Sequence, residues 1–210
     1  YLRNLPEAAS QMPSSIFEND EKRWKERFSD ISSMKGSENP YALHSELAEA
    51  MISNVLIVRE NEKLQSTLNV IEDIESRWKD IECVDTQDWS NPVPSFVNQL
   101  WNMIQLSKII TMGALKRDEF RGSHYKPEFD LNQPDDFDPA DYLEYEEQKA
   151  NGGVHKDQFA PSHVDYMERF EKNNEDWLKS SIATYNNGKP AVDFESVDTS
   201  LIAPRPRKYD

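Results

Sequence analysis

Residues 64–81 read LQSTLNVIEDIESRWKDI, and this stretch decides the fold class. Its apolar side chains recur at steps of three and four residues, at Leu64, Leu68, Ile71, Ile74, Trp78 and Ile81. A helix has about 3.6 residues per turn, so this spacing gathers all six on one face. The pattern predicts a long amphipathic helix that packs against other helices.

Three more helices are predicted on either side of this one. The first runs from Ser15 to about Met34, with Gly36 beyond its end, and the second opens at Asn39-Pro40. The fourth is expected to be capped by Ser95, to run to about Arg117, and to be apolar on most of its circumference. We therefore expect the fourth helix to be the central member of a bundle. The five tryptophans, Trp24, Trp78, Trp89, Trp101 and Trp177, are expected in the core.

The helical pattern ends after Arg121, where prolines and the pair Gly152-Gly153 interrupt it. Short helices are predicted at 139–149 and 162–179. Residues 181–185 and 190–194 alternate like strands on either side of an Asn-Gly turn, which predicts a small β-hairpin. The fold class is therefore mainly α, a helical bundle followed by an irregular region with short helices and a hairpin.

Charge and cysteine content exclude several classes of function. The net charge is −15, and residues 130–176 hold 14 acidic residues against four basic ones, so this stretch is predicted to be a solvated surface excursion. Such a balance repels phosphate, which argues against nucleic acid and against direct membrane-surface binding. Cys83 is the single cysteine, so the chain cannot form an internal disulfide or ligate an iron-sulfur cluster with its own thiolates.

No complete catalytic or metal site is recognisable in the sequence. The four histidines lack a Glu three residues before them, as a di-iron bundle needs, and no zinc, phosphate-loop or dinucleotide motif is present, so we predict no metal site. The unusual group is 118–126, DEFRGSHYK. Arg121 can clamp a carboxylate, Gly122 permits a sharp turn, and His124 can donate or accept a hydrogen bond. Alternatively, Glu119 and Arg121 pair with neighbours and Gly122 ends the helix.

Several motifs resemble the C-terminal region of succinate dehydrogenase and fumarate reductase flavoproteins. They are ENPY at 38–41, VLIVR at 55–59, RGSHYKPEF at 121–129 and NEDWLKSSIA at 174–183, in the family's order. The tail, VDTSL at 197–201 and PRPRKY at 204–209, is similar to the succinate dehydrogenase branch. The chain departs from the family at Phe120 and Ser123 and in an acidic insertion at 130–173.

The resemblance implies a three-helix bundle of spectrin-repeat type with a short preceding helix. Residues 1–14 would end an upstream flavin domain or form a linker, 15–120 would be the bundle, and 121–210 the extended C-terminal region. A chain that begins at Tyr1 without a Met fits an excised fragment. The parent subunit would carry covalent FAD and oxidise succinate to fumarate.

In the family, electrons pass to an iron-sulfur subunit, then to quinone, so the implied partners are the upstream flavin-binding and capping domains and that iron-sulfur subunit. A membrane anchor would be reached only indirectly, at the cytoplasmic face of a bacterial plasma membrane. Catalytic residues would lie upstream, so no catalytic residue and no cofactor is expected in this fragment. Arg121, Gly122 and His124 would make domain contacts near the flavin and substrate site.

Two other interpretations stay open at this point. One changes the branch, to a fumarate reductase or an L-aspartate oxidase. The other changes the class, to a stand-alone helical-bundle binding module.

Overall fold

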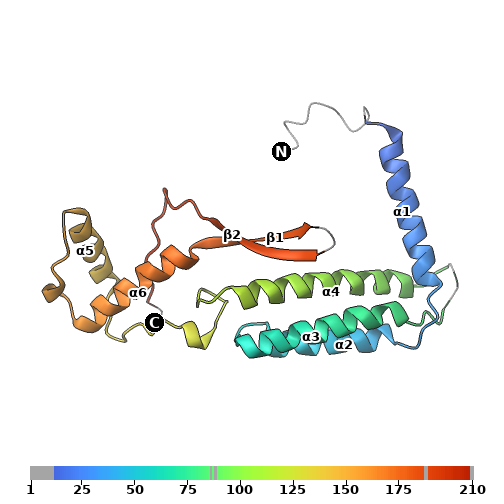
Figure 1. Ribbon diagram of the computed structural model, residues 1–210, viewed down its shortest axis with the longest axis horizontal. Helices are drawn as coiled ribbons and strands as arrows, with labels where there is room; N and C mark the ends of the chain where they lie inside the picture. Colours follow the sequence, from blue (N-terminus) through green and yellow to red (C-terminus); the bar gives the residue numbers. More distant parts are fainter. Residues whose placement is uncertain (1–11, 86, 88, 187–188, 209–210) are drawn as a thin grey trace. The chain divides into compact units, whose positions relative to one another are not determined.

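The computed structural model describes residues 12–85, 87, 89–186 and 189–208. Helices α1 (Ser14–Ser32), α2 (Pro40–Asn54), α3 (Asn61–Arg77), α4 (Val93–Lys116), α5 (Pro139–Ala150) and α6 (Pro161–Trp177) precede the strands β1 (Lys179–Asn186) and β2 (Lys189–Ser196) (Figure 1). The two strands pair antiparallel, with Ala183 opposite Val192. The mainly helical class with a C-terminal hairpin is confirmed. The predicted Asn187-Gly188 turn lies outside the described residues.

Local capping explains where the bundle helices begin. The Asn39 side chain accepts hydrogen bonds from the backbone N–H groups of Tyr41 (2.9 Å) and Ala42 (3.4 Å), so it caps α2 as its position before Pro40 predicts. The expected cap at Ser95 is wrong. Helix α4 begins two residues earlier at Val93, whose N–H donates to the side chain of Asn91 at 3.0 Å.

The chain divides into two compact units. The first comprises Tyr1–Glu49 and Asn69–Ser107, and the second comprises Ala50–Leu68 and Lys108–Asp210. The bounds of α2, α3 and α4 cross the division, so each unit contains a part of all three helices.

In the first unit, Trp78 anchors the core. Its side chain is 8% exposed, its indole N–H donates to the Val97 carbonyl at 3.0 Å, and its ring lies 4.8 Å from that of Trp101. Arg77 joins α3 to α2 through Glu38 (2.9 Å) and Glu46 (2.9 Å). The buried apolar residues of this unit are Ile31, Leu43, Leu47, Ile71, Ile74, Trp78, Ile81, Cys83, Val97, Leu100 and Ile104.

Two of the five tryptophans do not lie in a core. Trp89 is 89% exposed and Trp24 is 41% exposed, which corrects the expectation that all five are packed. Trp89 belongs to the connector between α3 and α4. Helix α1 exposes Ile16 and Phe17 as well, and Ile31 is its buried residue. The apolar stripe of α1 is therefore mostly uncovered in the described chain.

In the second unit, α4 has neighbours on two sides. Ala114 is buried with Val55, which directly follows α2, and with Leu64 near the start of α3. Across the helix, the Lys116 ammonium donates to the Val192 carbonyl of β2, so the hairpin runs along this part of α4 (Figure 1). Ile110 is nevertheless 50% exposed. The predicted central position of α4 holds here, with one apolar side left open.

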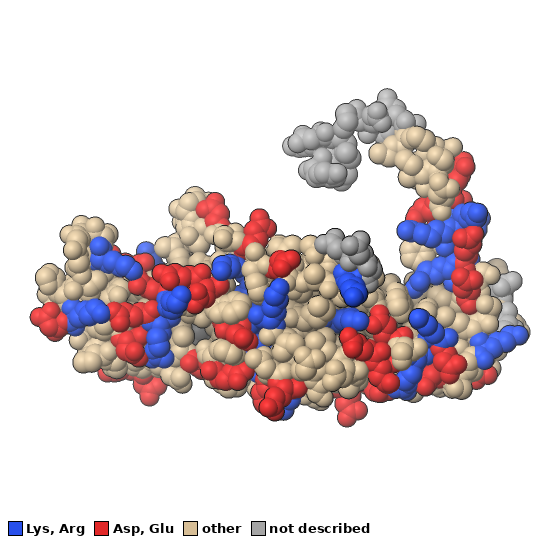
Figure 2. Space-filling model, viewed as in Figure 1, with Lys and Arg blue, Asp and Glu red and all other residues tan. Residues whose placement is uncertain are grey.

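The acidic stretch is more than a solvated excursion, because it has a hydrophobic core of its own. This core, which we call the insertion core, consists of Phe137, Tyr142, Tyr145, Phe159, Val164, Tyr166 and Met167. Its surface carries ion pairs such as Lys149–Glu171 (2.8 Å), and Figure 2 shows basic side chains interspersed among more numerous acidic ones in this region. The aromatic side chains of α5 and α6 face inward and form part of this core, whereas the carboxylates of the same helices stay on the surface.

His163 joins the parts of the insertion core and is expected to make its stability depend on pH. Its ring is 7% exposed and contacts Asp141 at 2.8 Å and Asp136 at 3.2 Å. Burial by itself lowers the His163 pKa, but hydrogen bonds and charge from both aspartates together raise it above its ordinary value.

A raised histidine pKa stabilises the fold fully below the ordinary value, about 6.5, and the gain is lost as pH rises through the raised value. The stability lost on His163→Gln should therefore be larger at pH 6 than at pH 9. His124, whose pKa is lowered, acts in the opposite direction and is present in both proteins. Thermal unfolding followed by circular dichroism checks this. The exposed His155→Gln should show no such dependence on pH. A loss in His163→Gln that is equal at pH 6 and pH 9 would contradict the assignment.

Candidate functional site

The Arg121 corner is a tight turn that follows α4. The backbone N–H of Arg121 donates to the His124 carbonyl at 3.0 Å, and the N–H of His124 donates back to the Arg121 carbonyl at 3.1 Å. Gly122 takes φ of +59°, a left-handed conformation that glycine adopts without strain. Gly122 does not end the helix, because α4 stops at Lys116. The glycine is therefore needed for the turn itself.

Glu119 holds the centre of this corner. Its side chain is fully buried and accepts hydrogen bonds from two guanidinium groups, those of Arg117 and Arg121 (2.8 Å). Asn173 of α6 adds a third donor at 3.3 Å, and Arg121 also donates to Asn174 at 2.9 Å. A buried carboxylate needs such partners to offset its desolvation. Glu119 thus joins the end of α4 to the end of α6.

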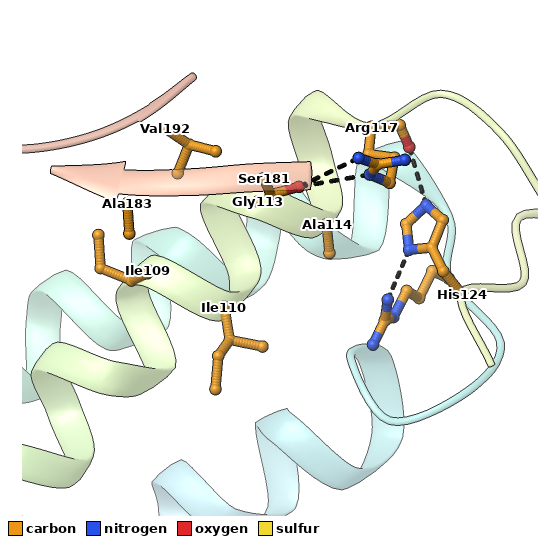
Figure 3. Close-up of a pocket in the computed structure, with 10 residues that line it drawn as sticks. Ile109, Ile110, Gly113, Ala114, Arg117, His124, Ser181, Ala183 and Val192 are labelled. Carbon is orange, nitrogen blue, oxygen red and sulfur yellow. Dashed lines mark hydrogen bonds between the residues drawn. The ribbon is translucent and has the colours of Figure 1, made fainter. Parts of the chain in front are cut away.

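Arg117 extends the same connection to the hairpin. Its guanidinium donates to the carbonyls of Trp177 (3.0 Å) and Lys179, at the junction of α6 and β1. It also lies within 3.4 Å of the Ser181 hydroxyl, the contact drawn in Figure 3. The planar fork of an arginine suits several acceptors at once. Its donors are therefore committed inside the chain.

His124 is a neutral bridge between two backbone segments. Its Nε2–H donates to the Arg117 carbonyl at 2.9 Å, and its Nδ1 accepts from the Arg59 guanidinium at 2.5 Å (Figure 3). Burial lowers the His124 pKa, and the positive charges of Arg59 and Lys126 lower it further, which outweighs the carbonyl and the Glu119 carboxylate. A neutral imidazole with this tautomer fits both contacts.

Lys126 connects the turn after α4 to the ends of α3 and α4. Its side chain is fully buried, and its ammonium donates to Asn61 (2.7 Å), Asp118 (2.8 Å) and the Leu115 carbonyl (3.1 Å). These acceptors satisfy all three protons of the ammonium. Because Asn61 begins α3 and Leu115 lies in the last turn of α4, Lys126 fixes the ends of those helices to each other.

An open pocket of about 290 Å³ lies beside the corner. Its floor is apolar, and its polar side chains gather at one end (Figure 3). The lining residues are Arg59, Ile109, Ile110, Gly113, Ala114, Arg117, His124, Ser181, Ala183 and Val192. The pocket thus combines an aliphatic surface with a cationic edge.

The structure brings the predicted residues together but shows a wider network than the sequence suggested. Arg121 contacts Glu119 within the chain, as the alternative interpretation expected. His124 bonds to Arg121 through its backbone, but its imidazole contacts Arg59. Sequence reasoning missed the roles of Arg59 and Arg117. The pairing of VLIVR at 55–59 with the turn was not visible in the spacing, because Arg59 and His124 are 65 residues apart.

Two absences concern only the residues that the structure describes. In this part of the chain, no cluster of three or more His, Cys, Asp or Glu side chains could hold a metal ion. Among the same residues, no helix is both long enough and apolar enough to cross a membrane.

These features define a class of protein: a helical domain in which a glycine turn, buried ion pairs and a C-terminal hairpin hold the ends of several helices together. Residues 44–209 match the sequence family described as "Fumarate reductase flavoprotein C-term". The chain belongs to this family, the C-terminal region of flavoproteins related to succinate dehydrogenase and fumarate reductase.

Known relatives agree with this family. The succinate dehydrogenase flavoprotein subunit of Bacillus subtilis is 37% identical over all of this chain and 29% of its own length. A flavoprotein subunit of the fumarate reductase from Wolinella succinogenes, which acts with 8-methylmenaquinol, is 26% identical over 63% of this chain and 21% of its own length. A quinol fumarate reductase structure from E. coli has a TM-score of 0.67 over 94% of this chain and 27% of that one, at 17% identity, and so supports the fold. The chain spans less than a third of these relatives.

Proposed function

We propose that this chain is the C-terminal part of the flavoprotein subunit of a succinate dehydrogenase, which oxidises succinate and passes electrons through covalent FAD to an iron-sulfur subunit, then to quinone. The observation that carries the branch is the 37% identity to the Bacillus subtilis subunit over the whole chain. A fumarate reductase is the second candidate, because several relatives bear that name.

The subunit would act at the cytoplasmic face of the plasma membrane, attached to it through its partners. FAD would be held by the preceding flavin-binding part, and the iron-sulfur subunit would be the direct electron acceptor. Turnover of the complete subunit with succinate, fumarate and L-aspartate separates the candidates. Succinate oxidation faster than fumarate reduction supports the proposal; preferred reduction of fumarate, or oxidation of aspartate, would replace it.

The role of this domain would be to brace the flavin-binding part. The network around Glu119 fixes the turn at Arg121, Gly122 and His124 with buried, charge-assisted hydrogen bonds. A binding or catalytic site keeps its geometry only if the residues that support it are themselves held in place by further contacts. This corner would supply such a support, and its residues would make domain contacts rather than perform chemistry.

Arg121→Ala should therefore reduce activity through loss of flavin. In the complete subunit we expect turnover and covalent flavin per polypeptide to fall together by about tenfold, since a buried charge loses a partner. Absorbance of the denatured protein measures the covalent flavin. Arg23→Ala is the control, because Arg23 lies on exposed α1 and pairs with Asp20 of its own helix. Normal flavin content in Arg121→Ala would contradict the bracing role.

A further inference from the structure

Arg59 differs from Arg117, Arg121 and Lys126 in the groups that balance its positive charge. Arg117 and Arg121 share the carboxylate of Glu119, and Lys126 pairs with Asp118. Among the residues that the structure describes, no carboxylate lies within ion-pair distance of Arg59. Its side-chain contacts in this part of the chain are neutral: the Val55 carbonyl at 2.7 Å, the Leu56 carbonyl at 3.4 Å and the His124 ring at 2.5 Å.

The surroundings of Arg59 disfavour a positive charge that has no carboxylate partner. Arg59 is half-buried, and burial lowers its pKa, which means that its environment disfavours the charge. The backbone N–H of Arg59 donates to the Tyr125 carbonyl at 2.8 Å, so the residue is also held firmly at its base. A partly desolvated guanidinium fixed in place is a strong site for a carboxylate, because its cost of ordering has already been met within the fold.

The surroundings of Arg59 indicate a protein surface as the source of that carboxylate. Arg59 stands at the edge of the pocket whose floor includes Ile110 and Ala114. Leu56, Ile57 and Val58, the residues before it, are 61%, 55% and 52% exposed. Exposed aliphatic side chains around one half-buried charge are typical of the centre of an interface, whereas a free small anion needs several convergent polar donors.

We propose that Arg59 forms an ion pair with an Asp or Glu from the preceding part of the subunit, which covers this pocket. The inference rests on the proposed function, since the Bacillus subtilis relative has 71% of its length outside the match, which covers 29% of it. The proposed function thereby gains a specific contact. His124 positions the Arg59 guanidinium from within this domain. The carboxylate of the preceding part of the subunit balances the positive charge of Arg59.

Zero-length coupling in the complete subunit tests this contact. Arg59→Lys places a primary amine at the position, and a carbodiimide joins an amine to a carboxylate in direct contact with loss of water. Peptide mass spectrometry then identifies the partner. The exposed pair Lys149–Glu171, 2.8 Å apart, serves as the coupling control in the same sample and reports that the insertion is folded.

A cross-link from position 59 to an Asp or Glu that precedes Tyr1 in the complete subunit supports the proposal. A cross-link to a carboxylate within residues 1–210, an amide with a free small carboxylate such as added succinate, or coupling of the control pair without any product at position 59 overturns it. Normal flavin and turnover in the unmodified subunit would show that the proposed function holds even in those cases.

Arg59→Gln gives a second, functional measurement. Loss of one partner from a buried pair weakens an interface by at least about tenfold, so covalent flavin per subunit should fall by that factor. Arg23→Gln on exposed α1 should leave it unchanged. Flavin content of Arg59→Gln equal to that of the control would contradict the ion pair.

Discussion

Glu119→Ala is expected to destabilise the chain by about 3–5 kcal/mol, because it leaves two arginines beside a buried cavity without their carboxylate. The Glu119 side chain is fully buried and Arg117 is 13% exposed, so water reaches the Arg117 contact poorly, whereas Arg121, 35% exposed, is partly solvated. The same change removes the acceptor that ties the end of α4 to Asn173 of α6. Urea unfolding of the 210-residue chain, followed by circular dichroism, measures the loss.

Two further variants sharpen this prediction. Glu119→Gln keeps the shape and two polar atoms but removes the charge, so it should cost less than Glu119→Ala. Glu18→Ala on the exposed face of α1 should change the stability by no more than about 0.5 kcal/mol. A loss in Glu119→Ala close to that of Glu18→Ala would show that the two arginines are solvated and that the buried network does not hold the corner.

Lys126→Ala is expected to destabilise the chain by about 3–4 kcal/mol, because it leaves a cavity and partly buried acceptors without a donor. The Lys126 ammonium has three acceptors, of which Asn61 and the Leu115 carbonyl belong to α3 and α4. Its loss should free the two helix ends from each other. Hydrogen exchange of the backbone amides near 61–64 and 112–116 should therefore accelerate along with the drop in stability.

Lys63→Ala is the matched control, because Lys63 lies on the exposed side of α3 and pairs with Glu60 one turn away. Exposed pairs of this kind contribute about 0.3–0.5 kcal/mol. Equal effects of Lys126→Ala and Lys63→Ala would contradict the role given to the buried ammonium.

Local patterns were enough to predict the helices of the bundle. The pair Asn39-Pro40 places the start of α2 correctly. The stripe from Leu64 to Ile81 places α3, but that helix ends at Arg77, where a 3-10 turn at Trp78–Asp80 leads into the extended Ile81. The start of α4 was misplaced because Asn91 and Ser95 are both plausible capping residues. Two residues of this type near Pro92 and Pro94 cannot be ranked by propensity.

Contacts between distant residues explain what was missed. The acidic composition of 130–173 suggested a solvated segment, whereas Tyr142, Phe159 and Met167 meet only once α5 and α6 fold back on each other. In the candidate site, the sequence pointed to Arg121 and His124 but gave no sign that Glu119 would be the buried centre. Ion-pair partners depend on burial, which spacing within one segment does not report.

Covalent flavin in the complete subunit is the most direct measure of the role proposed for this domain, which is to brace a flavin-binding domain. Flavin per polypeptide would be compared between the complete protein and a form that ends before Tyr1. We predict bound flavin in the complete protein and at least about a tenfold loss in the shortened form, because the support of the flavin site would be gone. Equal flavin in both forms would contradict the claim.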